Sequence, residues 1–134
     1  MPLFGGLTPK ALEVLLGRSR VVETPTGYLF CEEGAPGDTF FLLEAGGVEV
    51  CKRSPRGTRV LRRLGAGDCF GEMALMDLSP RSASVRATRP SRALEIPAAA
   101  LQALYEHDVE QFALLMMNMG REVSRRLRSA DAAE

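Results

Sequence analysis

The segment FGEMALMDLSPRSASVRA, residues Phe70 to Ala87, carries the most specific pattern in this sequence. It contains a carboxylate, Glu72, and a guanidinium, Arg81, with helix-forming residues between them and small residues after the arginine. The residues GEMAL can form one helical turn. The first backbone N–H groups of such a turn have no partner within the helix and attract an anion. The sequence therefore predicts an anion-binding turn here.

Other residues of the segment extend this predicted site. Gly71 lets a ligand approach the backbone closely, and Ala74 adds no bulk. Arg81 can bind two oxygens of one phosphate, and Ser82 adds a backbone N–H and a hydroxyl beside it. Glu72 would repel a phosphate, so we expect it to accept hydrogen bonds from neutral hydroxyls at the other end of the ligand. A 3′,5′-cyclic nucleotide offers such a phosphate close to a ribose hydroxyl.

The spacing of the two charged residues has a second interpretation. A buried glutamate and a buried arginine can form an ion pair with a purely structural role. The spacing alone leaves both interpretations open.

The residues around this segment predict a β-rich fold. Short β-prone runs lie between Ser19 and Ile96, and Gly, Pro and Asp separate them at GAPGD, SPRG and GAGD. The runs are VVET, YLFCEE, TFFLLEAG, GVEVCKR, TRVLRRL, SASVRA and RALEIP. Short strands with turns about every 8 to 12 residues indicate an antiparallel barrel or sandwich. We expect this β region to span about residues 19–97.

Helices are predicted on both sides of the β region. In LTPKALEVLLG, Thr8 is a candidate N-cap, Pro9 fits the first turn, and a short amphipathic helix covers about residues 8–17. Its expected apolar face carries Leu12, Leu15 and Leu16. After Ile96, PAAALQALYEH predicts one helix and Asp108 can cap another, so two C-terminal helices cover about residues 98–129.

The last helix carries an apolar stripe with heptad spacing. Val109, Phe112, Met116, Met119 and Val123 are separated by alternating steps of 3 and 4 residues. The stripe can pack on the chain's own sheet or form a homodimer contact. About two heptads are too few to decide between them.

Composition limits the classes of function. The 134 residues suit one domain, so we expect a single domain over residues 1–134. The formal net charge of zero gives no general attraction to nucleic acid or to an anionic membrane. The N-terminus shows no leader pattern, and no apolar run approaches the roughly 20 residues that span a bilayer. A cytoplasmic protein is expected.

The cysteines and the histidine argue against metal chemistry and catalysis. Cys31, Cys51 and Cys69 are odd in number and have no C-x-x-C spacing, so they predict small buried residues rather than disulfides or a zinc site. His107 is the only histidine. A metal-dependent β-roll enzyme needs several imidazoles, and a Ser-His-Asp or Cys-His set needs one at its site. We therefore expect no enzyme, no metal and no cofactor.

The segment from Phe70 onward resembles the phosphate-binding cassette of the cyclic nucleotide-binding domain family. The family pattern is F-G-E-[LM]-A-L followed, after variable residues, by P-R-[ST]-A-[ST]-V, and the sequence meets every fixed position. The resemblance extends to GYLFCEEGAPGDTFFLLEAGGVEV and LGAGDCFGE, and covers roughly Leu3 to Arg128. It implies a mainly β fold with flanking helices. That fold is an antiparallel, jelly-roll-like β-roll of about eight strands with a short N-terminal helix, two C-terminal helices, and the cassette at about residues 70–85.

The resemblance also implies roles for individual residues. Glu72 would bind the ribose 2′-OH, and Arg81 the cyclic phosphate. The backbone N–H groups of Ala74 and Ser82 would face that phosphate. The pocket would also be lined by Gly71, Met73 and Ala83.

The resemblance implies a regulatory role as well. Relatives with serine after the arginine generally take cAMP, so cAMP is expected ahead of cGMP. In the family the last helix often covers the base, and Met116, Met119 or Arg121 could do so here. We expect a sensor domain whose C-terminal helices move on binding, with an unidentified effector protein, a homodimer as a further option, and no direct contact with DNA or membrane. The alternative is a domain that has lost its ligand and serves as an interaction or dimerisation module.

Overall fold

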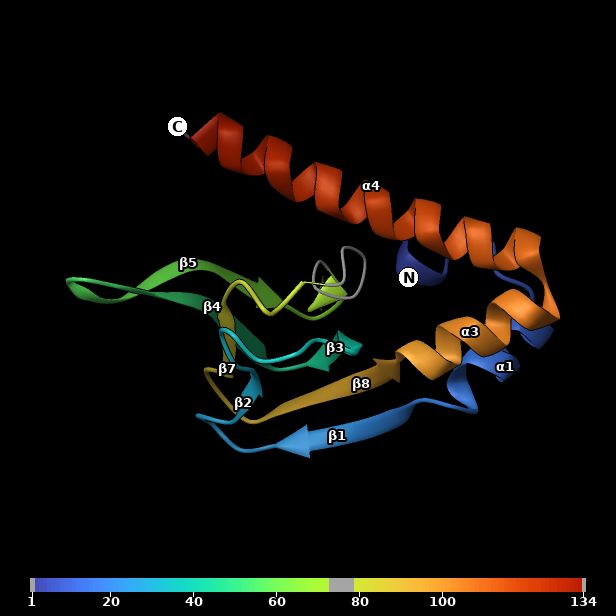
Figure 1. The fold of residues 1–134 in the computed structure, drawn as a ribbon, viewed down its shortest axis with the longest axis horizontal. Helices are drawn as coiled ribbons and strands as arrows, with labels where there is room; N and C mark the ends of the chain where they lie inside the picture. The colour runs from blue at the N-terminus through green and yellow to red at the C-terminus, as the bar shows by residue number, and fades with distance from the viewer. Residues whose placement is uncertain (1, 73–78, 134) are drawn as a thin grey trace. The chain divides into compact units, whose positions relative to one another are not determined.

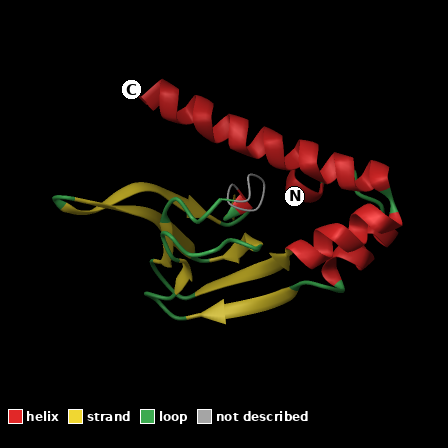
Figure 2. Cartoon of the chain, viewed as in Figure 1, coloured by secondary structure: helices red, strands yellow, loops and turns green. Residues whose placement is uncertain are grey.

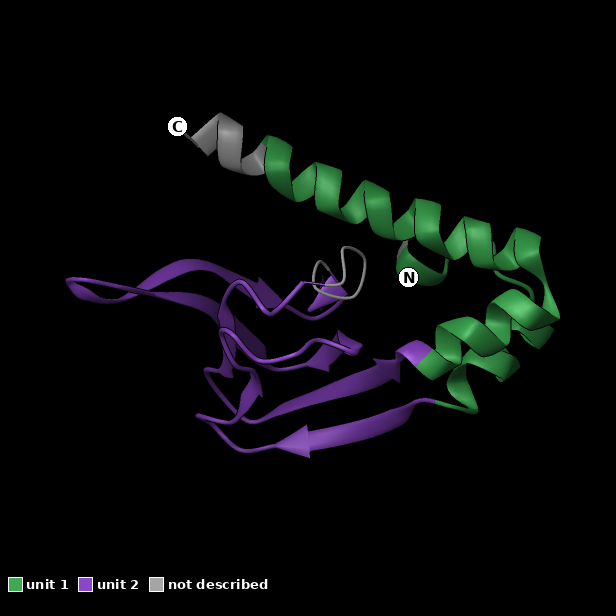
Figure 3. Ribbon diagram, viewed as in Figure 1, with its two compact units in different colours: residues 1–18, 99–134 green, residues 19–98 purple. Residues whose placement is uncertain are grey.

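The computed structural model describes residues 2–72 and 79–133. The chain divides into two compact units, residues 19–98 and residues 1–18 with 99–134 (Figure 3). The first unit holds the strands and the second holds the helices (Figure 2).

The strand unit consists of two antiparallel sheets with four strands each (Figure 1). One sheet has the order β1-β8-β3-β6 and the other the order β2-β7-β4-β5. This architecture confirms the predicted antiparallel β-roll. The strands are β1 (Arg20–Thr24), β2 (Leu29–Cys31), β3 (Thr39–Ala45), β4 (Gly47–Ser54), β5 (Gly57–Gly65), β6 (Cys69–Phe70), β7 (Ser84–Ala87) and β8 (Ser91–Pro97).

The core of the strand unit is filled from both sheets. Phe41, Leu43, Phe70 and Ala93 come from the first sheet, and the second sheet supplies further buried residues. The second-sheet residues are Cys31, Val48, Val50, Leu64 and Val85. The rings of Phe41 and Phe70 stack with centroids 5.1 Å apart, and Phe30 meets each of them edge-on at 5.3 Å. Side chains that alternate along each strand thus meet in one apolar layer.

All three cysteines belong to the buried part of the strand unit, as the sequence predicts. Cys31, Cys51 and Cys69 are free thiols with exposed fractions of 3%, 5% and 1%. The described residues contain no group of three or more His, Cys, Asp or Glu side chains that could hold a metal ion.

The helix unit begins with a 3-10 turn, η1 (Pro2–Phe4), and helix α1 (Pro9–Leu16). Thr8 caps α1, because its hydroxyl accepts a hydrogen bond from the Ala11 N–H at 3.1 Å. Ala11 and Leu15 are the buried residues of α1, whereas Leu16 is 42% exposed. The prediction that Leu16 shares the apolar face was therefore wrong. A helix of two turns buries a narrow i, i+4 stripe, and that stripe carries Ala11 and Leu15.

The C-terminal part of the unit contains α3 (Ala98–His107) and α4 (Val109–Ala133). Asp108 caps α4, because its carboxylate accepts from the N–H groups of Glu110 and Gln111 at 3.1 and 3.2 Å. Helix α4 extends to Ala133, past the predicted end near residue 129. Within the described residues, no helix is both long enough and apolar enough to cross a membrane.

The N-terminal segment packs on α4 within this unit. The side-chain amide of Asn118 donates to the carbonyl oxygens of Leu3 and Gly5 at 3.0 and 2.9 Å. Leu115 and Met119 are fully buried, whereas Val109 is 53% exposed. Within the predicted heptad stripe, Met119 is therefore covered by the chain's own residues and Val109, at the start of the stripe, is not.

Candidate functional site

The segment between β6 and β7 joins the two sheets, since β6 belongs to the first and β7 to the second. The predicted site residues Gly71 and Glu72 lie at its start, and Arg81, Ser82 and Ala83 lie at its end. The remaining two predicted residues, Met73 and Ala74, lie outside the described residues.

The Arg81 side chain is buried, with 8% of its surface exposed. Its guanidinium donates from Nη1 to the Gly71 carbonyl oxygen at 2.8 Å, and from Nη2 to the Thr39 carbonyl oxygen at 2.9 Å. Nη2 also lies 3.3 Å from the Thr39 hydroxyl. A guanidinium has five N–H donors, more than these contacts use. Arg81 therefore links both ends of the segment to β3 and can still donate to an anion.

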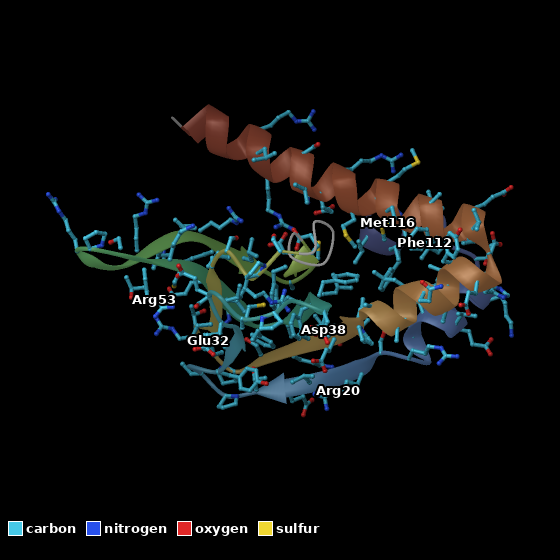
Figure 4. All side chains as sticks on the ribbon, viewed as in Figure 1. Arg20, Glu32, Asp38, Arg53, Phe112 and Met116 are labelled. Atoms are coloured by element: carbon cyan, nitrogen blue, oxygen red, sulfur yellow. The ribbon has the colours of Figure 1, made fainter. Side chains whose placement is uncertain are left out.

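The backbone of Arg81 is fixed as firmly as its side chain. The Arg81 N–H donates to the Ala35 carbonyl oxygen, and the Gly34 N–H donates to the Arg81 carbonyl oxygen, both at 2.8 Å. Gly34 and Ala35 belong to the turn between β2 and β3, which carries the EGAPGD sequence. Glu32 and Asp38 mark the two ends of this turn in Figure 4. A turn that is distant in the sequence thus holds the backbone of Arg81 in place.

Gly71 is required by the position of the arginine. Its backbone φ is +86°, a conformation that L side chains rarely adopt. A Cβ atom built on Gly71 would lie 2.6 Å from Nη1 of Arg81. From the sequence we expected this glycine to let a ligand approach the backbone. In the structure the group that approaches its backbone is the Arg81 guanidinium.

Glu72 is buried as well, with 2% of its surface exposed. Both charged residues act on the thiol of Cys31. Burial raises the pKa of that thiol to about 11, the Arg81 guanidinium lowers it, and the Glu72 carboxylate raises it. The glutamate and the arginine thus lie within electrostatic reach of the same buried atom. Charged side chains are rarely buried to this extent away from a functional or structural pairing.

The last two predicted residues differ in burial. Ser82 is exposed. Ala83 is half-buried and packs against the apolar core. The next residue, Ser84, accepts a hydrogen bond from the Glu33 N–H at 2.9 Å, which ties the start of β7 to the start of the EGAPGD turn.

Several residues around Arg81 were not identified from the sequence. They are Thr39, Gly34, Ala35 and Cys31. The signal in the sequence was the EGAPGD turn, which the family pattern contains, but spacing could not show that Arg81 lies against it. Thr39 lies 42 residues from Arg81 in the chain.

An antiparallel roll of two sheets, with a buried arginine and a buried glutamate on the segment between them, defines a β-roll domain with a candidate ligand site at the sheet junction. The sequence model of one family, described as the cyclic nucleotide-binding domain, matches residues 21–108. The chain belongs to the cyclic nucleotide-binding domain family.

Individual relatives agree with this assignment. The chain is 42% identical over 86 residues to a cAMP-dependent protein kinase regulatory subunit of Aspergillus fumigatus, which covers 63% of the chain and 20% of the relative. It is 31% identical over 102 residues to a CRP-like cAMP-activated global transcriptional regulator of Mycobacterium tuberculosis, covering 75% and 46% of the two chains. The chain thus spans less than half the length of either relative.

The fold is shared with solved structures. The crystal structure of the Thermus thermophilus catabolite activator protein superposes with a TM-score of 0.81 at 31% sequence identity. That match covers 99% of this chain and 61% of the other.

Proposed function

We propose that this chain is a regulatory domain that binds a 3′,5′-cyclic nucleotide, with cAMP preferred over cGMP. The observation that carries the proposal is the burial of Glu72 and Arg81 beside one thiol, at the start and end of the segment that matches the family's cassette. The names of the relatives, which include cAMP-dependent and cAMP-activated proteins, support the choice of cAMP.

In this proposal Arg81 donates to the cyclic phosphate and Glu72 accepts from the ribose 2′-OH. The N–H groups of Ala74 and Ser82 face the phosphate, and Gly71, Met73 and Ala83 line the pocket. The bonds of Arg81 to Gly71 and Thr39 orient its guanidinium before the ligand arrives. A fixed guanidinium loses less conformational entropy when it binds phosphate. The function is binding alone, without a catalytic step or a cofactor.

Calorimetric titration with cAMP, cGMP and cyclic di-GMP in parallel tests the ligand. We expect heat from cAMP that saturates at one ligand per chain, weaker binding of cGMP and none of cyclic di-GMP. Absence of binding to all three would reject the proposal.

A structural role for Arg81 would leave the chain as an interaction module without a ligand. The bonds from the Arg81 guanidinium to the backbone carbonyl groups of Gly71 and Thr39 favour this second candidate, because they stabilise the fold with no ligand present. The same titration separates the two candidates, because the interaction module predicts no heat with any nucleotide.

The regulatory step is a shift in the helix unit. The division of the chain into a strand unit and a helix unit supports it, because two bodies with their own contacts can change their relation on ligand binding. For the helices to shift, the ligand must bind more tightly when α3 and α4 are in one position than when they are in another. Hydrogen exchange over residues 108–128 with and without saturating cAMP measures it, and unchanged protection would rule it out.

A homodimer through α4 belongs to the same proposal. Met117 and Leu127 are 57% and 62% exposed on this helix, and burial of such side chains favours association. Sedimentation of the parent and of Met117→Glu tests it, since the substitution should shift a dimer to the monomer. In this proposal the effector protein binds the helix unit in the cytoplasm. Neither DNA nor a membrane is a direct partner.

A further inference from the structure

Strand β5 forms one edge of the second sheet. The order β2-β7-β4-β5 leaves β4 as the strand paired with β5 in the described part of the chain. Seven of the nine residues of β5 are exposed, from Gly57 to Arg63. Figure 1 shows β4 and β5 extending as a hairpin beyond β2 and β7. An edge strand presents backbone N–H and C=O groups that can pair with another extended chain. We call the side of β5 that faces away from β4 the β5 edge.

The hairpin is strongly basic. Between Val50 and Ala66 the sequence has no Asp or Glu and holds six of the chain's 17 Lys and Arg residues. They are Lys52, Arg53, Arg56, Arg59, Arg62 and Arg63. All six are exposed. A zero net charge for the whole chain therefore hides a local positive surface.

The strand register brings two of these cations together. Lys52 on β4 lies directly opposite Arg59 on β5. Like charges in directly opposed cross-strand positions destabilise a sheet. In the described residues, neither Lys52 nor Arg59 takes part in an ion pair with a carboxylate of the chain. An external carboxylate beside this pair would relieve the repulsion.

Other cations of the hairpin already have acidic neighbours. Arg53, labelled in Figure 4, has its Nε 3.9 Å from Glu33, and its N–H donates to the same carboxylate at 3.0 Å. Arg63 lies opposite Glu49 in the strand register. A hydrogen bond from Arg86 is the main cause that lowers the pKa of the Glu49 carboxyl, and the charge of Arg63 lowers it further. Arg53 and Arg63 thus have acidic neighbours within the chain, whereas Lys52 and Arg59 lie opposite each other.

We propose that the β5 edge binds an extended acidic segment of a partner protein, which adds to the sheet as a strand beside β5. The edge offers both N–H and C=O groups, so it matches a polypeptide, which supplies both acceptors and donors. A nucleic-acid backbone supplies only acceptors along its phosphates. Val60 and Leu61, 39% and 38% exposed, add apolar contact area for such a segment. A second copy of β5 fits poorly, because it would bring arginines against arginines.

Fluorescence anisotropy with a labelled nine-residue peptide of alternating Glu and Val tests the proposal. Two further peptides carry N-methyl groups, one on every Glu nitrogen and the other on every Val nitrogen. In a strand, successive N–H groups point to opposite sides. We therefore expect one N-methylated peptide to bind at least tenfold more weakly than the parent peptide, and the other to bind within threefold of it.

Charge variants of the protein complete the experiment. Arg59→Glu places an acid opposite Lys52, so its fold should be kept or stabilised while peptide affinity falls at least tenfold. Arg18→Glu is the matched control, because it changes an exposed arginine outside the strands by the same charge, and its affinity should stay within twofold. The proposal is overturned if the acidic peptide does not bind, if both N-methylated peptides bind like the parent, or if duplex DNA or anionic vesicles bind more tightly than the peptide.

Discussion

Arg81 is a charged side chain in a position where water is largely excluded, and its surroundings explain how the protein tolerates it. Its guanidinium is hydrogen-bonded to Gly71 and Thr39, and its backbone is bonded to Gly34 and Ala35. A buried donor left without partners would cost about 1 to 3 kcal/mol. Hydrogen bonds within the chain thus hold the arginine in place before any ligand binds.

Replacement of Gly71 tests how closely the backbone and Arg81 are coupled. Gly71→Ala adds a Cβ that would lie 2.6 Å from Nη1 and keeps an unfavourable φ of +86°. We expect a loss of about 2 to 4 kcal/mol in unfolding free energy, from backbone strain and overpacking together. Urea unfolding measures this loss.

Gly27→Ala is the matched control for that substitution. Its φ is +89°, but a Cβ there meets nothing within 4 Å. It should cost about 1 to 2 kcal/mol from the backbone conformation alone and leave cAMP affinity unchanged. Equal losses for the two alanines would show that the guanidinium does not constrain Gly71.

The thiol of Cys31 reports on both charged residues. The Glu72 carboxylate raises the pKa of Cys31, so Glu72→Gln should lower that pKa from about 11. Arg81 lowers it, so Arg81→Gln should raise it. The ¹³Cβ shift of Cys31 followed against pH measures both effects, with Glu33→Gln as a control expected to leave the titration unchanged. If Glu72→Gln leaves the pKa of Cys31 unchanged, the Glu72 carboxylate does not lie near this thiol.

The same thiol gives stability a dependence on pH. Its pKa is raised from 9.0 to about 11 in the folded chain, so the folded state keeps its proton after the unfolded state has lost it. The contribution of Cys31 is therefore fully present below pH 9 and falls as pH rises toward 11. Relative to Cys31→Ala, the parent should lose about 2 to 3 kcal/mol over this interval. Urea unfolding at several pH values checks it, and parallel curves for the two proteins would contradict it.

At the scale of the elements, periodic signals in the sequence were sufficient for most of the fold. Each of the seven β-prone runs overlaps a strand, and Thr8 and Asp108 cap helices where expected. Strand β6 was not seen as a run, because Cys69–Phe70 is too short to show alternation. It is recognisable only by its pairing with β3. The end of α4 was also missed, because alanine-rich residues beyond 129 carry no stop signal.

The cap of α4 provides a test at this scale. Asp108→Ala removes a carboxylate that accepts from two N–H groups at the start of the helix. We expect unfolding free energy to fall by about 0.5 to 2 kcal/mol. Asp108→Asn keeps an acceptor at the same place and should lose less. Equal stability of the alanine variant and the parent would show that the cap contributes nothing.

For the whole molecule, the site is assembled from parts that sequence spacing cannot bring together. Glu72 and Arg81 were identified as a pair because both belong to one cassette. Thr39 and the EGAPGD turn join them only through the pairing of strands within two sheets. The hydrophobic pattern and the turns set the register of neighbouring strands, but they do not show which strands distant in the sequence will pair. The regulatory proposal also belongs to this scale, because it requires the helix unit to respond when a ligand binds the strand unit.

The central claim is that Arg81 and Glu72 hold two ends of one cyclic nucleotide. Calorimetry with cAMP and with its 2′-deoxy analogue, on the parent and on Glu72→Ala, tests it most directly. If Glu72 accepts from the 2′-OH, the parent should bind cAMP at least tenfold more tightly than the analogue, because a hydrogen bond to a charged group contributes about 1.5 to 3 kcal/mol. Glu72→Ala should bind both ligands equally. Equal affinity of the parent for the two ligands would contradict the account.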